Sequence, residues 1–455
     1  MIVRRVAATS VLTIALALAL PAMPAGAHPL GNFTVNAAAA VTVAADQLRI
    51  DYVLDLAEIP TFQERRVIDA DADSSLDEEE RVAWSRQRAE EIRSGLSLLV
   101  DGKRVPLRVE TASMFLRPGQ GGLDVLRLET SLIGVVTGRG TVELEDRNDA
   151  GRVGWREMTA IGVDKVAVTG SSVPSVSPSD GLRAYPEDLL ESPPSIRRAR
   201  FAFGPGRQAA PSPATAGGAS GSPAGVDSPL TGLVARSGLS PGIVLLALLG
   251  AVAVGALHAL APGHGKTVAA AYLVTTRGRI RQALSVGVVV AAMHTTSVLA
   301  LGAVLLLAKR TFPLDRLYPW MGIVAGVGAV VLGAALLASR LRYQRGPVHQ
   351  HAHPLSRRGL GALALAGGLL PSPTAVVVLL AASSLGRLGL GVAMVIAFGV
   401  GLAASLSTVG VVAVSAGGFI GRRAPAGLTA AFPVAGAGVI VLAGAAISLR
   451  ALAQL

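Results

Sequence analysis

Apolar residues divide the chain into two regions with different patterns. In the C-terminal region they form runs long enough to cross a bilayer, which takes about 20 residues of helix. We place these runs near 241–261, 283–308, 318–338, 359–382, 388–417 and 430–449. A shorter apolar stretch at 267–274 either continues the first run or re-enters the membrane. The pattern predicts a polytopic α-helical membrane domain with six or seven spans over residues 230–455.

The region before the spans has the shorter period of β-strands. The segments "VTVAADQLRIDYVLDL", "LSLLVDGKRVPLRVE", "LDVLRLETSLIGVV" and "GTVELED" alternate apolar and polar residues or are rich in β-branched ones. One helix is expected near 78–94. The pattern predicts a mostly β exported domain over 28–203, arranged as a sandwich. Residues 204–229 are dominated by Pro, Gly, Ala and Ser, which is typical of a flexible linker.

The first 27 residues have the three parts of a secretory signal peptide. Arg4 and Arg5 precede an apolar run, which ends at Ala25-Gly26-Ala27. Cleavage after Ala27 would leave His28 as the N-terminus, whereas an uncleaved signal would be an additional transmembrane helix. In either case the β domain is expected on the extracytoplasmic side.

The charge distribution supports a multi-pass protein of the cytoplasmic membrane. The chain carries a net charge of +11, but from Thr231 onward one acidic residue, Asp315, stands against 17 Lys and Arg. Most of these basic residues lie in the loops that would face the cytoplasm, as the positive-inside rule requires. Basic residues confined to short loops between spans also argue against nucleic-acid binding. The chain has no cysteine, which excludes thiol chemistry, Cys-ligated zinc and iron–sulfur clusters.

Two membrane segments share a weak internal similarity. "LAPGHGKTVAAAYL" and "LLPSPTAVVVLLAA" align on Pro262 and Pro371, and each proline would interrupt its segment. Three spans separate the two copies, so the copies would run in opposite directions. Such an inverted 3+3 repeat places a substrate site where the broken helices meet. The alternative is two unrelated proline kinks.

Three histidines lie at or near membrane depth, where ionisable groups are costly and suggest a transport pathway. They are His258, His264 and His294, and neutral imidazole binds nickel, cobalt, copper and zinc. A break at Pro262-Gly263 would allow His264 to fold back towards His258. Each histidine could instead be a hydrogen-bonded structural group. No motif for ATP hydrolysis is found and the spans contain no Glu, so we do not expect an enzyme.

Residues 69–80 have the sequence "DADADSSLDEEE", which follows the ligand order of an EF-hand calcium loop. The ligands would be Asp69, Asp71, Asp73, Ser75, Asp77 and Glu80. Ser74 occupies the position that normally requires glycine, and the entering helix is not evident from the sequence. The alternative is an acidic helix start that binds no metal.

Two further groups of histidines are weaker metal-binding candidates. His28 would combine a free α-amine with its ring nitrogen after signal cleavage. His349, His351 and His353 alternate in a predicted cytoplasmic loop, where they bind metal or are simply solvated.

The membrane strings resemble a known family. "HALAPGHGKTVAAAYLV", the His-Thr-Thr-Ser of residues 294–297 and "GGLLPSPTAVVVLL" are similar to the NicO-type nickel/cobalt transporters. "HPLGNFTVN", "GWREM" and "LRAYPEDLL" resemble the exported domain fused to many bacterial members. The resemblance implies a carrier of Ni²⁺ or Co²⁺ in either direction, with the transport-critical histidines at His258, His264 and His294. Relatives often have Pro-Cys-Pro where this chain has Pro371-Ser372-Pro373.

We therefore expect Ni²⁺ or Co²⁺ transport through a histidine-lined site near the midplane. Thr295, Ser297 and the backbone freed at Pro262, Gly263, Pro371 and Pro373 would assist, and Ca²⁺ would bind the exported domain. The rival interpretations are an exporter of an anion or small organic solute, and a membrane-anchored metal-sensing or assembly protein.

Overall fold

The computed structural model describes residues 30–73, 75–190, 192–208, 240–260, 280–308, 314–343, 357–421 and 426–452. These residues form two compact units, one mostly β and one helical. The signal segment 1–27, most of the predicted linker and the stretch 267–274 lie outside the described residues.

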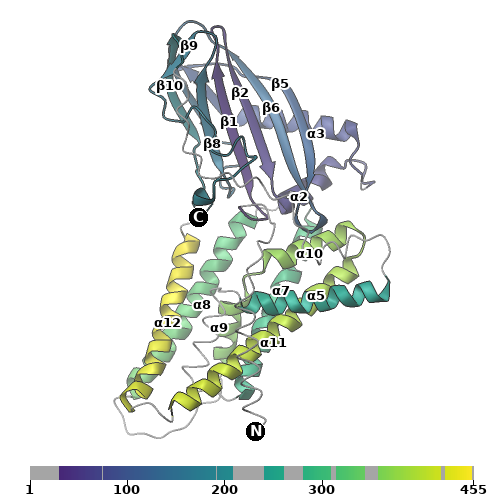
Figure 1. Ribbon diagram of the computed structural model, residues 1–455, viewed down its shortest axis with the longest axis vertical. Helices are drawn as coiled ribbons and strands as arrows, with labels where there is room; N and C mark the ends of the chain where they lie inside the picture. Colours follow the sequence, from purple (N-terminus) through teal and green to yellow (C-terminus); the bar gives the residue numbers. More distant parts are fainter. Residues whose placement is uncertain are drawn as a thin grey trace. The chain divides into compact units, whose positions relative to one another are not determined.

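The β unit contains two five-stranded sheets (Figure 1). The first sheet has the order β5-β6-β2-β1-β8, with β1 Val35–Val43, β2 Gln47–Leu56, β5 Arg108–Pro118, β6 Asp124–Val135 and β8 Arg156–Gly162. The second has the order β4-β3-β7-β10-β9, with β3 Leu96–Val100, β4 Lys103–Arg104, β7 Gly140–Asp146, β9 Val166–Thr169 and β10 Arg198–Pro205. Strands β1 and β8 pair in parallel and the other pairs are antiparallel. Strand β10 continues two residues past the boundary predicted at 203.

One apolar core joins the two sheets, as a sandwich requires. Ile50 and Leu128 of the first sheet and Leu144 and Phe201 of the second belong to the same buried cluster. Along β2, buried residues alternate with more exposed ones, so the opposite face of the first sheet points away from the core.

Two helices, α2 Glu58–Ile68 and α3 Glu78–Gly95, accompany the sheets. The sequence predicts α3 and not α2. A capping box starts α3: Asp77 accepts a hydrogen bond from the backbone of Glu80, and the Glu80 side chain accepts one from the backbone of Asp77. Two short 3₁₀ turns lie at Gln120–Gly122 and Glu187–Leu189.

The helical unit contains seven described helices: α5 Pro241–Leu260, α7 Ile280–Leu307, α8 Leu314–Tyr343, α9 Arg357–Gly368, α10 Pro373–Ser384, α11 Leu388–Gly421 and α12 Ala426–Leu452. Among the described residues, five are long and apolar enough to cross a membrane, or six if the bent pair α9–α10 is one span. The pair is bent by 73° in the segment that the sequence predicts to be broken by Pro371. The inverted repeat stays a prediction, because its other break, at Pro262, lies outside the described residues.

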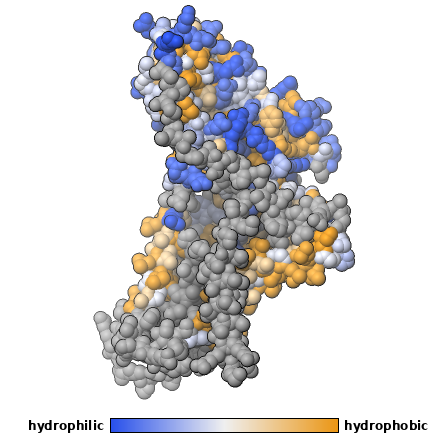
Figure 2. Space-filling view, in the orientation of Figure 1, coloured by the Kyte–Doolittle hydropathy of each residue, from blue (hydrophilic) through white to orange (hydrophobic). Residues whose placement is uncertain are grey.

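The surfaces of the two units differ in the way that water and lipid require. Figure 2 shows mostly hydrophilic side chains on the β unit and hydrophobic ones on the described part of the helical unit. Leu245, Leu249 and Leu442 of the helical unit are each more than half exposed. Such side chains are costly in water and suit a lipid environment.

Candidate metal-transport site

His258 and His294 lie next to each other although 36 positions separate them in the sequence. His258 is near the C-terminal end of α5 and His294 is in the middle of α7, where it is 5% exposed. Their ring centroids are 5.9 Å apart. This separation is of the order expected for two imidazoles that each form a metal–nitrogen bond of about 2.1 Å to one ion. His264, Pro262 and Gly263 lie outside the described residues.

A phenylalanine that the sequence analysis does not single out completes this group of rings. Phe398 of α11 has its ring centroid 5.5 Å from that of His258 and 6.0 Å from that of His294. It is stacked on His294 with an interplanar angle of 23°. The only signal in the sequence is an aromatic residue within a helix of mainly small and aliphatic ones. The Phe398 ring therefore lies beside both imidazoles.

Glycines allow α5 and α11 to approach closely enough to bring these rings together. A Cβ atom on Gly255 would lie 2.0 Å from the carbonyl oxygen of Phe398, and one on Gly401 would lie 1.9 Å from that of Val252. Both distances are impossible contacts, so only glycine fits at either position. Small residues at a helix crossing are the usual means of close packing in membranes.

The broken segment α9–α10 meets α7 beside His294. The Ser297 hydroxyl donates to the carbonyl oxygens of His294 (2.8 Å) and Gly368 (3.2 Å). Gly368 lies so close to α7 that a Cβ there would be 2.5 Å from the carbonyl oxygen of Val290. The Tyr318 hydroxyl of α8 donates to the carbonyl oxygen of Pro371 at 3.3 Å. The predicted residues His294, Ser297 and Pro371 therefore belong to one region of the helical unit.

Polar atoms gather where the segment is broken. Pro373 is the first residue of α10, and Ser372 before it is 4% exposed, with no hydrogen-bond partner for its Oγ among the described residues. Thr295, one position beyond His294, faces α11, because a Cβ on Gly399 would lie 2.2 Å from its Oγ1.

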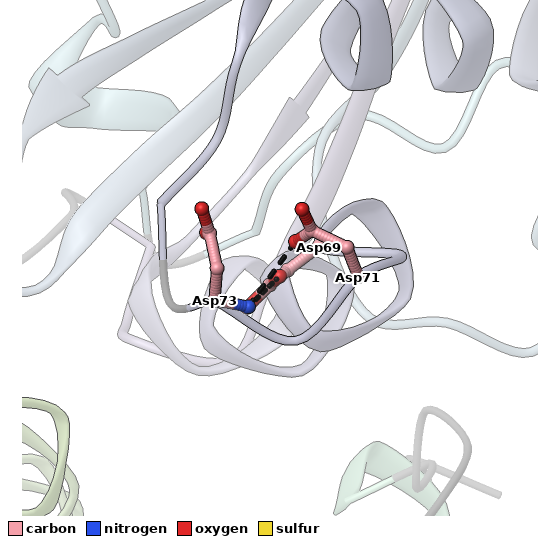
Figure 3. A group of neighbouring side chains, drawn as sticks. All are labelled: Asp69, Asp71 and Asp73. Carbon is pink, nitrogen blue, oxygen red and sulfur yellow. Dashed lines mark hydrogen bonds between the residues drawn. The ribbon is translucent and has the colours of Figure 1, made fainter.

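The acidic loop before α3 is a second candidate site. The carboxylates of Asp69, Asp71 and Asp73 each place an oxygen within 4.8 Å of the others (Figure 3). The backbone N–H of Asp73 donates to Asp69 Oδ1 (3.0 Å) and to Asp71 Oδ1 (3.1 Å). Helix α2 ends just before the loop, so it supplies the entering helix that the sequence does not reveal.

The remaining predicted ligands of this loop are placed differently. The Glu80 carboxylate accepts hydrogen bonds from the backbone of Ala70 (2.7 Å) and of Asp77 (3.2 Å). The side chain of Asp77 caps α3, and the backbone of Ser75 donates to Asp73 Oδ1 at 2.6 Å. Glu80 thus links the helix to the start of the loop, whereas the three aspartates converge on their own. His28, His349, His351 and His353 lie outside the described residues.

Comparisons with known proteins give a consistent result. The chain is 31% identical over 201 residues to "Putative nickel/cobalt efflux system MJ1092" of Methanocaldococcus jannaschii, a match that covers 44% of this chain and 91% of the relative. It is 28% identical over 207 residues to "Nickel/cobalt efflux system RcnA" of Escherichia coli (strain K12), over 35% of this chain and 76% of the relative. The protein of the same name from Shigella sonnei is 28% identical over 209 residues, with the same coverage of 35% and 76%.

Two other comparisons give no match. No family model matches the chain, and no solved structure matches it. The similarity to the archaeal protein covers nearly all of that relative, and the apolar helices agree with it. The chain belongs to the family of these nickel/cobalt efflux systems.

Proposed function

We propose that the chain exports Ni²⁺ or Co²⁺ across the cytoplasmic membrane through a site built on His258 and His294. The observation that carries this proposal is the 5.9 Å separation of the two imidazole rings, which belong to different helices. Histidines at membrane depth are expensive to maintain, and two that face one another suit a shared cation. The names of the relatives support efflux rather than uptake and do not favour an exporter of anions or organic solutes.

The ligand chemistry fits a metal that must be released after it is bound. From Thr231 onward the sequence has a single acidic residue, Asp315, so the spans provide neutral nitrogen and oxygen donors rather than carboxylates. Imidazole nitrogen is well suited to nickel and cobalt. A site without carboxylates does not neutralise the charge of the ion, and this limits how tightly the ion is held. We assign His264 as the third imidazole ligand on the resemblance of its motif.

Backbone and hydroxyl groups at the broken segment would provide further contacts. Irregular backbone is tolerated in a membrane where it is buried in protein or faces a water-filled path. Gly368 and Pro371 contribute carbonyl groups to this region, and Ser297 joins one of them to α7. We place the path of the ion along α7 past this break, with Thr295, Ser297 and Ser372 as its hydroxyl groups and Pro262, Gly263 and Pro373 at its helix breaks. His349, His351 and His353 would collect metal from the cytoplasm, and His28 would contact it outside.

We further propose that the loop at Asp69, Asp71 and Asp73 binds Ca²⁺ on the extracytoplasmic side. The convergence of three carboxylates between two helices supports this role, because calcium prefers six to eight oxygen ligands. Ser75, Asp77 and Glu80 would complete the ligand set after the Glu80 side chain leaves its hydrogen bonds. The ion would act as a structural link rather than as a substrate.

Metal accumulation in intact cells tests the transport proposal. Cells that express the native chain should hold less nickel than cells that express His294→Ala or His264→Ala, and the same should hold for cobalt. Ser285→Ala is the matched control, because Ser285 lies on α7 and its hydroxyl donates to the backbone of the same helix, at the carbonyl oxygen of Gln282. Higher accumulation with the native chain would indicate uptake. If cells with the native chain and cells with the histidine variants hold the same amount of each metal, the proposed histidine site is excluded.

A further inference from the structure

Three strings of the β unit that transport does not use come together on one face of the first sheet. Leu30 of "HPLGNFTVN", Trp155 of "GWREM" and Leu182 and Tyr185 of "LRAYPEDLL" form one apolar cluster with Ala38. The Trp155 and Tyr185 rings meet edge to face, with centroids 5.4 Å apart. Side chains alternate along β1, and the neighbours of Ala38 belong to the sandwich core, so the cluster lies on the opposite face of the sheet.

Beside this cluster the same face carries a hollow of about 400 Å³. The side chains of its floor pair in register across neighbouring strands: Phe115 with Arg127, Ser113 with Glu129, and Thr111 with Ser131, Asp51 and Ala40 in turn. From the row of Phe115 to that of Thr111 the floor extends four residues along β5, or roughly 14 Å. The hollow is therefore large enough for a small molecule.

Arg127 holds the wall of the hollow to its floor. Its side chain is 1% exposed, and it donates from Nε to Glu129 (2.7 Å) and from Nη2 to the carbonyl oxygen of Gly181 (2.9 Å). Asp55 lies opposite Arg127 in register on β2. The charge of Arg127 is therefore balanced by neighbouring carboxylates and does not attract an anion into the hollow.

Acidic side chains outnumber basic ones around the hollow. The lining contains Asp51, Glu129 and Glu157 against Arg127 and Arg183. Glu157 accepts three hydrogen bonds, all from uncharged side chains, and these donors do not balance its charge. The hollow therefore disfavours a ligand that carries a negative charge.

The carboxylates on the floor have acceptor oxygens to offer a ligand. Asp51 Oδ1 accepts from the Ser131 hydroxyl at 2.6 Å, and Glu129 Oε1 accepts from Arg127. Within the described part of the chain, the second oxygen of each carboxylate accepts no hydrogen bond. The exposed Thr111 and Ser113 lie beside these carboxylates, and their hydroxyl groups can donate or accept. The floor thus presents acceptors and donors side by side.

Phe115 gives the same floor an apolar surface. Its side chain is 47% exposed, although most of the lining consists of polar or small side chains. Ser113 is two positions away on the same face of β5, and Glu129 is opposite Ser113. A ligand that covers the Phe115 ring can therefore reach Ser113 and Glu129 with groups at its rim.

We propose that this hollow binds a sugar without a negative charge, as a mono- or disaccharide unit. One pyranose ring lies with its C–H face on Phe115 and donates from a hydroxyl group to Glu129, and a second ring reaches Asp51 and Thr111. A hydroxyl group both donates and accepts, whereas an ammonium group only donates and a carboxylate only accepts. A peptide group donates and accepts but has no apolar ring face. A sugar therefore matches the acceptors, the hydroxyl groups and the aromatic ring together.

Calorimetric titration of the full chain, in a detergent whose head group is not a sugar, tests the proposal. The probes are two neutral disaccharides, cellobiose and diacetylchitobiose. Glucuronate, putrescine and acetyl-triglycine amide serve as the anion, the cation and the peptide for comparison. We expect saturable binding of at least one disaccharide, about tenfold tighter than that of the three comparison ligands. No disaccharide binding, or disaccharide binding that is not tighter than that of all three, would overturn the proposal.

The length of the sugar distinguishes its source. A strand of envelope polysaccharide continues beyond the hollow, so a site for such a strand binds the tetramer of the same sugar more tightly than the dimer. A site for a free sugar binds the tetramer no more tightly than the dimer. Either result supports a sugar as the ligand.

Variants of Phe115 test the ring contact. Phe115→Ala should weaken binding about tenfold, and Phe115→Trp, which keeps an aromatic ring, should bind as the native chain does. Val135→Ala is the matched control, since Val135 is 72% exposed on β6 and lies outside the hollow. Both alanine variants should unfold at the native temperature, because both side chains are exposed. Native affinity in Phe115→Ala would contradict the proposed contact.

Variants of the remaining floor locate the binding. Ala40→Phe should abolish it by filling the hollow, whereas Thr42→Phe adds the same ring on the same strand and face but outside the hollow. Asp51→Asn should weaken binding about tenfold, because an NH₂ group replaces an acceptor oxygen. Equal loss in Ala40→Phe and Thr42→Phe, or native affinity in Asp51→Asn, would contradict the proposal. Nickel export is measured in parallel, and its failure would bear on the transport proposal alone.

Discussion

The two units of this chain differ in the number and arrangement of their polar side chains. In the β unit they are numerous and supported by one another, as Glu157 is by Trp155, Ser177 and Ser179. In the helical unit they are few, and His258, His294 and Ser297 lie near the same helix break. Water tolerates a distributed network, whereas lipid makes every polar group costly. A single substitution near the histidines should therefore abolish metal export, whereas a single substitution in the β unit should leave export in place.

The largest effect is expected where α5 and α11 cross. Gly255→Val forces the helices apart, because a Cβ at this position would lie 2.0 Å from the carbonyl oxygen of Phe398. Overpacking of this kind costs about 1–3 kcal/mol, and the separation moves His258 away from its neighbours. We expect export in the cell assay to be lost. Gly242→Val on the same helix should leave export intact, since its nearest neighbour is 3.9 Å away. Similar export by both variants would show that the crossing does not position the site.

A smaller loss is expected from Phe398→Leu. The substitution keeps an apolar side chain but removes the ring that lies within 6.0 Å of both imidazole centroids. The histidines gain rotational freedom, so export should fall by about three- to tenfold, which corresponds to roughly 1 kcal/mol. Leu402→Met, one turn further along α11, is the control. If the Phe398→Leu variant exports metal as well as the native chain, the ring does not contribute to the site.

The third prediction concerns the calcium loop, where calcium should affect the stability of the β unit and not export. Calcium at one hundred times its dissociation constant should stabilise the native chain by about 2.7 kcal/mol. Asp71→Asn and Asp73→Asn should abolish this gain in thermal unfolding, while Glu79→Gln, an exposed residue of α3 outside the ligand order, should keep it. Nickel export should change little. An unfolding midpoint that does not respond to calcium in the native chain would exclude the site.

The smallest effect concerns the buried tyrosines. Burial raises the pKa of Tyr52 well above 10, and the nearby Asp146 carboxylate raises it further. Burial acts in the same direction on Tyr185. Above pH 10 each phenol is protonated in the folded state and ionised in the unfolded state. The free energy of unfolding is therefore unaffected below pH 10 and falls as the pH rises beyond it. The Tyr52 hydroxyl donates a hydrogen bond to Asp146 Oδ2 at 2.9 Å. Tyr52→Phe should cost about 1 kcal/mol at neutral pH through the loss of this bond and should reduce the alkaline decline. Urea unfolding between pH 8 and about 11 measures both effects, and an unchanged decline would contradict this account.

The same contrast decides what the sequence can predict. The apolar spans, the membrane histidines and the interruption at Pro371 are predictable because a bilayer restricts composition so strongly. Phe398 is not, since its position beside both histidines depends on how α5, α7 and α11 pack. Local patterns contain no information about that packing.

In the β unit the sequence predicts the strands better than the contacts between distant segments. Helix α2 contains Pro60 and buries the polar Glu58 and Gln63, so its pattern does not indicate a helix. It is held by distant contacts: Glu58 accepts from the backbone of Gln120, and Thr61 accepts from that of Leu126. Strand β8 buries Arg156 and Glu157 and pairs with β1 over a separation of more than 100 residues. A polar strand with a distant partner gives no local signal.

The central claim is that one metal ion contacts the imidazoles of both His258 and His294. Nickel-edge X-ray absorption of the purified, nickel-loaded chain counts the imidazole ligands directly. The account predicts three in the native protein, with His264 as the third, and one fewer in each of His258→Ala and His294→Ala. A count that is the same in the native protein and in both variants would contradict it.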